Sequence, residues 1–268
     1  MAINNNLVIG ITEGSDPAFG NWEQALTDSN GDYIVNGAIL ITKNLHDALI
    51  ADILRVNRTL PISVHATCTG WGGTPMEPHV PAPRIQLRQI RKLIRAGFPR
   101  NRITLRIDPI IDVGNGVEVA ASVAKTALAH GILTPNDPNS VRVRISVLDC
   151  YPHVRDRFRE RGIAVPYDGT FTAPKSTFNK IAIAFKPIID AGIIINTCAE
   201  PLLTANPGFA QQGCLSTHDL DVMGISYDPA CLTKCQQRST CTCLGIKREL
   251  LPVKKPCPHQ CAYCYWRD

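Results

Sequence analysis

The last twelve residues of the chain, CPHQCAYCYWRD, contain three cysteines, Cys257, Cys261 and Cys264. A structural zinc site uses four ligands, so these thiols form one only if His259 or another residue supplies the fourth. A 4Fe–4S cluster also takes four thiolates, and three thiolates leave one iron open to a non-protein ligand. The C-x3-C-x2-C spacing therefore predicts a metal centre with an open coordination position, which a catalytic cluster requires.

Cysteine is abundant in the rest of the chain as well. The sequence contains eleven cysteines, and seven of them lie in the 38 residues from Cys231 to the C-terminus. An odd number does not fit a framework of paired disulfides, and a reducing compartment keeps thiols free to bind metal. Cys68 and Cys150 are isolated at the ends of predicted strands, where a cysteine usually acts as a small buried hydrophobic side chain. The clustering predicts metal binding in the C-terminal part of the chain.

The composition is that of a globular protein. Of the 268 residues, 44% are apolar and 19% are charged, which is enough apolar surface for a large core. No apolar run reaches the roughly 18 residues that cross a bilayer. The first residues, MAINNNLVIG, lack the basic and apolar regions of a signal peptide. We therefore expect a cytoplasmic protein with no membrane partner.

The formal net charge of +5 is unevenly distributed. Residues 231–268 carry seven basic and two acidic side chains, which accounts for the whole excess. Residues 84–106 carry eight basic side chains and no acidic one, and a predicted helix there aligns Arg84, Arg88, Arg91 and Arg95 on one stripe. Two interpretations remain open: a surface that binds nucleic-acid phosphates, or a solvated helix face and local balance for anionic thiolates.

Short β-branched runs alternate with helical patterns along most of the chain. Strands are predicted over residues 7–12, 38–42, 62–67, 103–107, 141–148 and 193–197, and helices over residues 45–56, 85–96, 117–129 and 176–191. This alternation predicts an α/β fold with a parallel sheet, either a full or partial barrel or a doubly wound open sheet. Beyond residue 201 the alternation gives way to loop signals, a short helix near residues 218–223 and an extended stretch at residues 248–253.

Polar or small residues follow every predicted strand. The carboxyl ends of parallel strands meet at one edge of a sheet or barrel, so these residues are expected to line a common site. The groups able to bind or ionise there include Glu13, Ser15, Asp16, Lys43, Asn44, Thr69, Arg106, Asp108, Ser146, Asp149 and Glu200. Arg106 and Asp108 alternate along one strand and share a face, either as ligand-binding groups or as a buried ion pair.

Three further polar residues lie within predicted strands. His65 belongs to an apolar strand and is expected to be a core histidine rather than a catalytic base. Arg142 and Arg144 alternate along another strand. The pattern leaves open whether they point into a barrel or away from it.

At its C-terminus the chain resembles the radical SAM superfamily, whose signature is C-x3-C-x-aromatic-C. Cys257, Cys261, Tyr263 and Cys264 match that signature, and CPHQCAYCY is most similar to the spore photoproduct lyase-like branch. The resemblance implies that the three cysteines bind a catalytic 4Fe–4S cluster whose open iron chelates S-adenosylmethionine. Reductive cleavage, with flavodoxin or ferredoxin as the electron donor, then yields a 5′-deoxyadenosyl radical.

The terminal position of this loop departs from the superfamily, which usually carries it after the first barrel strand. The resemblance therefore implies an α/β fold that is a circularly permuted, partial TIM-type barrel of about six or seven parallel strands. Residues 248–253 would form the family's first strand and residues 7–12 its second. The turn TEGSDP at residues 12–17 then takes the place of the family's Gly-Gly-Glu-like turn, which it matches only in part.

That placement implies roles for the polar residues. Glu13, Ser15 and Asp16 become candidate contacts of the cofactor amine, Arg106 of its carboxylate and Asp108 of its ribose, with Glu200 and Tyr263 also facing the cofactor. Lys43, Asn44 and Thr69 become candidate substrate contacts.

A closer resemblance, to a bacterial family of unknown function grouped with the spore photoproduct lyase-like proteins, runs over nearly the whole chain. Its landmarks appear in order as ITKN (41–44), RIDPI (106–110), TCAE (197–200), GC (213–214), CTC (241–243) and the terminal CPHQCAYCY. They include Cys198, Cys214, Cys241 and Cys243, which suffice for an auxiliary 4Fe–4S cluster or a structural zinc ion. Cys231 and Cys235 are alternative ligands in that group.

These observations predict one structural domain, with a β/α core over residues 1–201, a Cys-rich segment over residues 202–247, and a last strand and cluster loop over residues 248–268. The first functional hypothesis is a radical SAM lyase or isomerase, with a modified thymine in DNA as the first substrate to test, by analogy with the branch. The alternative is a non-catalytic protein, stabilised by zinc or an iron–sulfur cluster, that binds nucleic acid or senses redox state.

Overall fold

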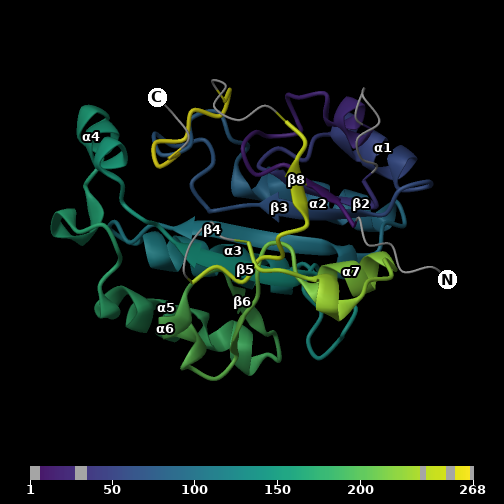
Figure 1. Ribbon diagram of the computed structural model, residues 1–268. Helices are drawn as coiled ribbons and strands as arrows, with labels where there is room; N and C mark the ends of the chain where they lie inside the picture. The colour runs from purple at the N-terminus through teal and green to yellow at the C-terminus, as the bar shows by residue number, and fades with distance from the viewer. Residues whose placement is uncertain (1–6, 28–34, 236–239, 252–256, 266–268) are drawn as a thin grey trace.

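The centre of the molecule is a single parallel sheet. The computed structural model describes residues 7–27, 35–235, 240–251 and 257–265. In these residues eight strands form one open sheet in the order β7-β6-β5-β4-β3-β2-β1-β8 (Figure 1). They are β1 (Ile9–Ile11), β2 (Gly37–Thr42), β3 (Ile62–Thr67), β4 (Ile103–Ile110), β5 (Arg142–Val147), β6 (Ile195–Thr197), β7 (Phe209–Gln211) and β8 (Lys247–Glu249).

Helices connect most of these strands. They are α1 (Asp47–Val56), α2 (Pro83–Arg95), α3 (Gly116–Ala129), α4 (Pro152–Glu160), α5 (Lys175–Asp190), α6 (Pro201–Thr204) and α7 (Thr217–Met223), with 3-10 turns at Trp22–Leu26, Arg100–Arg102, Pro166–Gly169 and Pro229–Cys231. In the described ranges, no helix combines the length and the apolar character needed to span a bilayer.

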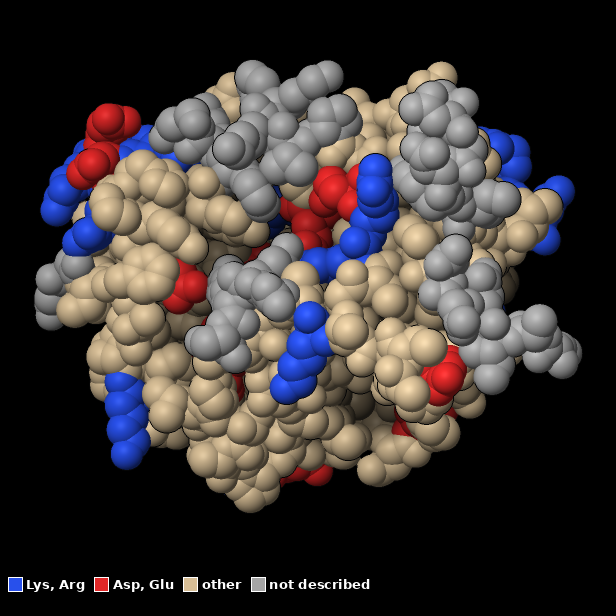
Figure 2. Space-filling view, in the orientation of Figure 1, with Lys and Arg blue, Asp and Glu red and all other residues tan. Residues whose placement is uncertain are grey.

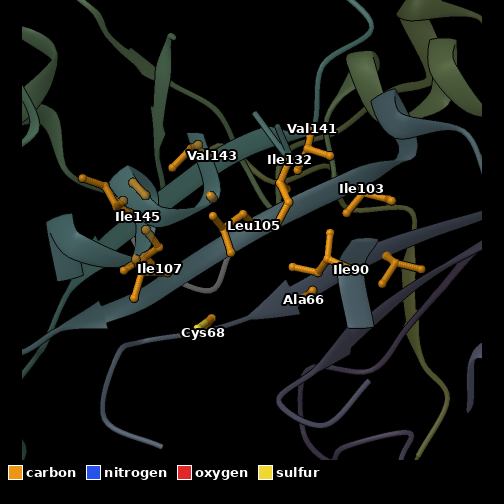
Figure 3. Packing of buried hydrophobic residues seen from close by; sticks show 14 of the residues in the cluster. Ala66, Cys68, Ile90, Ile103, Leu105, Ile107, Ile132, Val141, Val143 and Ile145 are labelled. Carbon is orange, nitrogen blue, oxygen red and sulfur yellow. The ribbon is translucent and has the colours of Figure 1, made fainter. Parts of the chain in front are cut away.

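One face of the sheet is apolar. Successive side chains of a strand point to opposite faces, and the register aligns Leu40 with Val64 and Leu105 with Val143. These side chains pack against the apolar stripes of α1, α2, α3 and α5 in one large core. Figure 3 shows part of it, with Ile90 of α2 against Ala66 and Ile103, and Cys68 at the border of the cluster. The helices are therefore held by hydrophobic burial on this face.

The opposite face of the sheet carries polar side chains across β3, β4 and β5. The register pairs His65 with Thr104 and Thr104 with Arg142, and it pairs Arg106 with Arg144 in the next row. His65 and Arg144 are fully buried there. The short helix α7 covers part of this face, where its Leu220 and Met223 pack on Ile residues of β1 and β2. Both strand arginines that the sequence left unassigned thus lie on this polar face.

The end of the chain pairs with its beginning. β8 lies parallel to β1, with the Ile9 N–H donating to Ile246 O at 2.9 Å and the Leu250 N–H donating to Ile11 O at 2.8 Å. The carboxylate of Glu249 then accepts the amides of Glu13 and Gly14 at 2.8 and 2.9 Å. This pairing extends the sheet by one strand and anchors the turn that follows β1.

The predicted elements match the structure, with three additions and one shift. The sheet has eight described strands rather than six or seven, because β7 is a three-residue strand inside a segment of loop signals. The helices α4 and α6 were also missed: α4 has only two buried apolar residues among its charges, and α6 spans four residues. The predicted strand 248–253 is observed as Lys247–Glu249, and its residues 252–253 lie outside the described ranges.

The C-terminal cysteine loop is held by contacts with the rest of the protein. Cys261, Ala262 and Tyr263 are buried in a second apolar cluster with Met76, and the Ala262 N–H donates to Met76 O at 2.9 Å. From α4, Arg157 Nη1 donates to the carbonyls of Ala262 and Cys264 at 2.9 and 2.7 Å. The loop therefore does not depend on metal alone to stay in place.

We expect Arg157→Met to destabilise the protein by about 2 kcal/mol, because two carbonyls lose a charged hydrogen-bond donor in a buried place. The measurement is anaerobic urea unfolding. Arg159→Met is the matched control on the same helix, since Arg159 is exposed and its ion pair with Asp156 contributes little. Equal losses in the two variants would contradict the role given to Arg157.

Candidate functional site

A cavity of about 190 Å³ opens at the carboxyl ends of the strands. Five strand ends contribute to its lining, and the terminal loop closes one side. From the strands come Thr12, Glu13, Gly14, Ser15, Asp16, Ile41, Thr42, Lys43, Thr67, Arg106, Asp108, Pro109, Ser146, Val147, Leu148, Asp149 and Tyr151, and from the loop Cys257, His259, Cys261, Tyr263, Cys264 and Tyr265. The site thus combines both ends of the sequence.

The three cysteines of the terminal motif all line this cavity. Cys261 is buried, whereas Cys257 and Cys264 are partly exposed. The loop turns between the first two through Gln260, whose φ of 51° lies in the left-handed region. Burial raises the pKa of the Cys261 thiol to about 12, so its thiolate needs a bound metal to persist at neutral pH. This donor set fits a metal centre.

His259 fixes the loop to the strand ends. Its Nε2 lies 2.8 Å from Asp16 Oδ2 and its Nδ1 lies 3.2 Å from His79 O, so both ring nitrogens face acceptor oxygens. Asp16 also accepts the Thr42 hydroxyl and the Lys43 amide, each at 2.7 Å. Burial raises the pKa of Asp16, but the hydrogen bond and charge of His259 outweigh it, and the net pKa is lowered. With both nitrogens engaged, His259 positions the loop and leaves three thiols as metal ligands.

A buried carboxylate, Glu77, joins the predicted substrate contacts to the loop. Lys43 Nζ lies 2.9 Å from Glu77 Oε1 and 2.5 Å from the hydroxyl of Tyr263. Tyr263 donates to Glu77, and the Thr69 hydroxyl donates to Glu77 Oε2 at 2.7 Å. Burial raises the pKa of Glu77, but the Lys43 charge and the hydrogen bonds from Lys43, Tyr263 and Thr69 together outweigh it, and the net pKa is lowered. The sequence prediction missed Glu77, because it is a single acidic residue in a Gly- and Pro-rich loop after β3.

Two further ion pairs flank the cavity. Arg106 pairs with Asp108, as the alternation along β4 allowed, and both line the cavity. Glu13 Oε2 lies 2.6 Å from Lys247 Nζ. Burial lowers the pKa of Lys247, yet the Glu13 carboxylate outweighs this and raises it to about 12. Every charged side chain predicted after β1 and on β4 therefore lies at the cavity and is already paired with another side chain of the protein.

Three predicted contacts lie outside the cavity lining. Thr69 is buried and donates its hydroxyl to Glu77. Asn44 follows Lys43, and its backbone N–H donates to the Thr42 hydroxyl at 3.0 Å. Glu200 accepts the Val147 amide at 2.8 Å and so supports the end of β5. In contrast, Ser146 and Asp149 line the cavity as expected of residues at a strand end, and Tyr151 and Tyr265 line it without having been predicted. Tyr151 follows the end of β5, whose polar character was the available signal.

A second group of cysteines lies on the polar face of the sheet. The thiols of Cys198, Cys214 and Cys243 all lie within 4.8 Å of one another and could hold a metal. Cys241 and Cys235 pack beside them, Cys241 buried and Cys235 partly buried. Cys231 is exposed and contacts Asp228. The structure therefore brings together the predicted auxiliary ligands, with Cys231 apart from them.

The surface around β8 carries both signs of charge. Figure 2 shows acidic and basic side chains side by side near the centre of this face, over the region where Figure 1 draws β8. Other basic side chains on the same face are scattered among uncharged ones. The described basic side chains on this face do not form one continuous track.

A family model matches residues 16–266, a range that includes both cysteine groups and the cavity lining from Asp16 onward. The chain belongs to the family described as Domain of unknown function (DUF1848). A comparison with curated proteins finds no match. The family description assigns no chemistry to this DUF1848 chain, so its function has to be argued from the site.

We expect Lys43→Met and Glu77→Gln each to destabilise the chain by about 3–5 kcal/mol, because each leaves its partner charged and poorly compensated in a buried place. The double variant should lose clearly less than the sum, since no charge is then left alone. Anaerobic urea unfolding measures all three. Lys92→Met, which removes an exposed pair with Asp47, is the control and should change stability by less than about 0.5 kcal/mol. Additive losses at Lys43 and Glu77 would contradict the pairing.

Proposed function

We propose that this protein is a radical S-adenosylmethionine enzyme whose catalytic 4Fe–4S cluster is held by Cys257, Cys261 and Cys264. The observation that carries the proposal is the convergence of these three thiols with polar strand ends in one cavity. Ligand sites of parallel α/β proteins lie at the carboxyl ends of the strands. The donor set also fits, because His259 is engaged with Asp16 and His79 and only three thiols remain as ligands.

The order of the strands supports a circular permutation. When the sheet order is taken from β8, it continues through β1, β2, β3, β4, β5 and β6 to β7, which is the chain order with the last strand moved to the front. The cysteine loop then follows the first strand, as the resemblance to radical SAM barrels requires. The main helices α1, α2, α3 and α5 all pack on one face, which fits a partial barrel better than a doubly wound sheet.

When bound, the cluster would chelate S-adenosylmethionine at its open iron and supply the electron that yields a 5′-deoxyadenosyl radical. Around it, Asp16 orients the loop through His259, and Lys43 holds the Tyr263 hydroxyl beside Glu77. Glu13, Ser15 and the Arg106–Asp108 pair present polar groups to the same cavity and are the proposed cofactor contacts. The apolar cluster under Cys261 keeps water from the inner side of the loop.

The reaction class and the substrate rest on the resemblance of the terminal motif. We assign a lyase- or isomerase-type rearrangement in the cytoplasm, with flavodoxin or ferredoxin as reductant and a modified thymine nucleotide in DNA as the first substrate to test. Phosphate-binding charge is available on α2, where Arg84, Arg88 and Arg95 are exposed. The rival function is that of a metal-stabilised protein that binds nucleic acid or senses redox state. The observation that favours it is the second cysteine group.

We expect Cys261→Ala to lose the cluster of the terminal loop, and with it the formation of 5′-deoxyadenosine from S-adenosylmethionine and dithionite. The measurement is iron and sulfide content of anaerobically prepared protein, followed by the 5′-deoxyadenosine assay. Cys68→Ala is the matched control, since each cysteine is 5% exposed but Cys68 lies in the hydrophobic core. A wild-type protein without iron, or one with iron that forms no 5′-deoxyadenosine, would contradict the proposal and favour the rival function.

A further inference from the structure

The second cysteine group joins three separate segments of the chain. Cys198 follows β6, Cys214 follows β7 and Cys243 precedes β8. β7 and β8 are the two edges of the described sheet. The group therefore connects segments from opposite edges across the polar face. None of its thiols lines the cavity described above.

The spacing of the sulfurs is that of ligands on a single ion. Cys198 Sγ and Cys214 Sγ lie 3.8 Å apart, and all three sulfurs lie within 4.8 Å of one another. A zinc–sulfur bond of about 2.3 Å puts the corners of a regular tetrahedron about 3.8 Å apart. In a 4Fe–4S cube each thiolate binds a different iron and extends outward, so its sulfurs lie farther apart.

Backbone amides support a thiolate at this place. The Cys214 N–H donates to Cys243 Sγ at 3.1 Å, and the Cys243 N–H approaches Cys241 Sγ at 3.5 Å. Cys241 is buried in the same cluster and is two residues from Cys243, so it is the nearest source of a fourth ligand. Hydrogen bonds to a ligating sulfur stabilise its charged form.

A buried cation, Arg144, lies beside the group, and no carboxylate of the described residues pairs with it at contact distance. Arg144 is fully buried, and its hydrogen-bond partners in the described part of the chain are His65 Nδ1, Cys214 O and Gln212 Oε1 at 3.3–3.5 Å. Burial and the Arg144 charge hold the pKa of His65 well below its usual range, so this partner is neutral. Buried charges need a counter-charge nearby. The buried Asp219 carboxylate supplies part of it, since the charges of Arg142, its partner, and of Arg144 lower the pKa of Asp219. Four thiolates around one divalent ion would add two further negative charges.

We propose that Cys198, Cys214, Cys241 and Cys243 bind one zinc ion in a closed tetrahedral site, which ties the segments after β6 and β7 to the segment before β8. Binding releases the thiol protons and forms four zinc–sulfur bonds. With all four positions occupied by protein, the ion has no open site for a substrate. Its role is to hold the two edges of the sheet together across the polar face.

The first experiment measures metals in the anaerobically purified full chain. We expect about one zinc per chain in addition to the iron of the terminal loop, and zinc X-ray absorption with four sulfur neighbours at about 2.3 Å. A variant with Cys257, Cys261 and Cys264 all changed to Ala should lose the iron and keep the zinc. This variant tests the zinc site independently of the proposed function, because its zinc content is measured whether or not the terminal loop binds a cluster in the wild-type protein.

Ligand variants locate the zinc. Cys214→Ser and Cys241→Ser should lose it, whereas Cys231→Ser, at the exposed cysteine on Asp228, should keep it. A second group of irons with sulfide in place of zinc would overturn the proposal. Zinc retained in Cys214→Ser would also overturn it. If Cys235→Ser loses the zinc and Cys241→Ser keeps it, the fourth ligand is Cys235 and the assignment of Cys241 is wrong.

A glycine variant tests the spacing without removing a ligand. A Cβ on Gly213 would lie 2.6 Å from the Cys243 amide nitrogen and 2.7 Å from its Cα, so Gly213→Ala should force the two segments apart. We expect its zinc affinity, measured by chelator competition, to fall about tenfold or more. Gly245→Ala is the matched control, since its Cβ first meets the Thr233 hydroxyl at 2.8 Å. Equal affinity in the two variants would contradict the proposed geometry.

Discussion

The parallel pairing of β8 with β1 determines where the groups of the cavity lie. Through it, the segment that leads to the terminal loop lies beside the first described strand, and Glu249 binds the turn that follows β1. His259 then reaches Asp16 on that turn. A chain end frays when nothing holds it. Here the strand pairing, a buried apolar cluster and two carbonyls bound by Arg157 hold residues 257–265 in place.

Three pairs of opposite charge and one histidine–carboxylate pair surround the cavity: Glu77 with Lys43, Glu13 with Lys247, Arg106 with Asp108, and His259 with Asp16. Removing such charges from water costs free energy that their attraction only partly offsets, so their main effect is to orient groups. Two of the pairs, those of His259 and Lys247, join the C-terminal segments to the beginning of the chain. The same side chains that line the cavity therefore also determine how the ends of the chain meet.

The two cysteine groups differ in the arrangement of their thiols. Cys257, Cys261 and Cys264 come from one short loop and face a cavity, an arrangement that leaves room for a non-protein ligand. Cys198, Cys214 and Cys243 come from three segments and converge away from it. The first arrangement suits chemistry at an open coordination position, and the second suits a crosslink. One chain thus separates a proposed reactive site from a proposed structural one on the same polar side of its sheet.

The sequence by itself determined the α/β class, six of the strand positions and the C-terminal cysteine motif, because β-branched runs, helical periodicity and cysteine spacing are local properties. It also placed Glu13, Asp16, Lys43, Arg106 and Asp108 at one rim, since parallel strands share a carboxyl edge. Only the tertiary structure decided that Glu77 joins Lys43 to Tyr263, that His259 binds Asp16, and that Arg144 is buried beside Cys214. Those contacts join residues far apart in the sequence, and pairings of that kind depend on strand order and packing rather than on any local pattern.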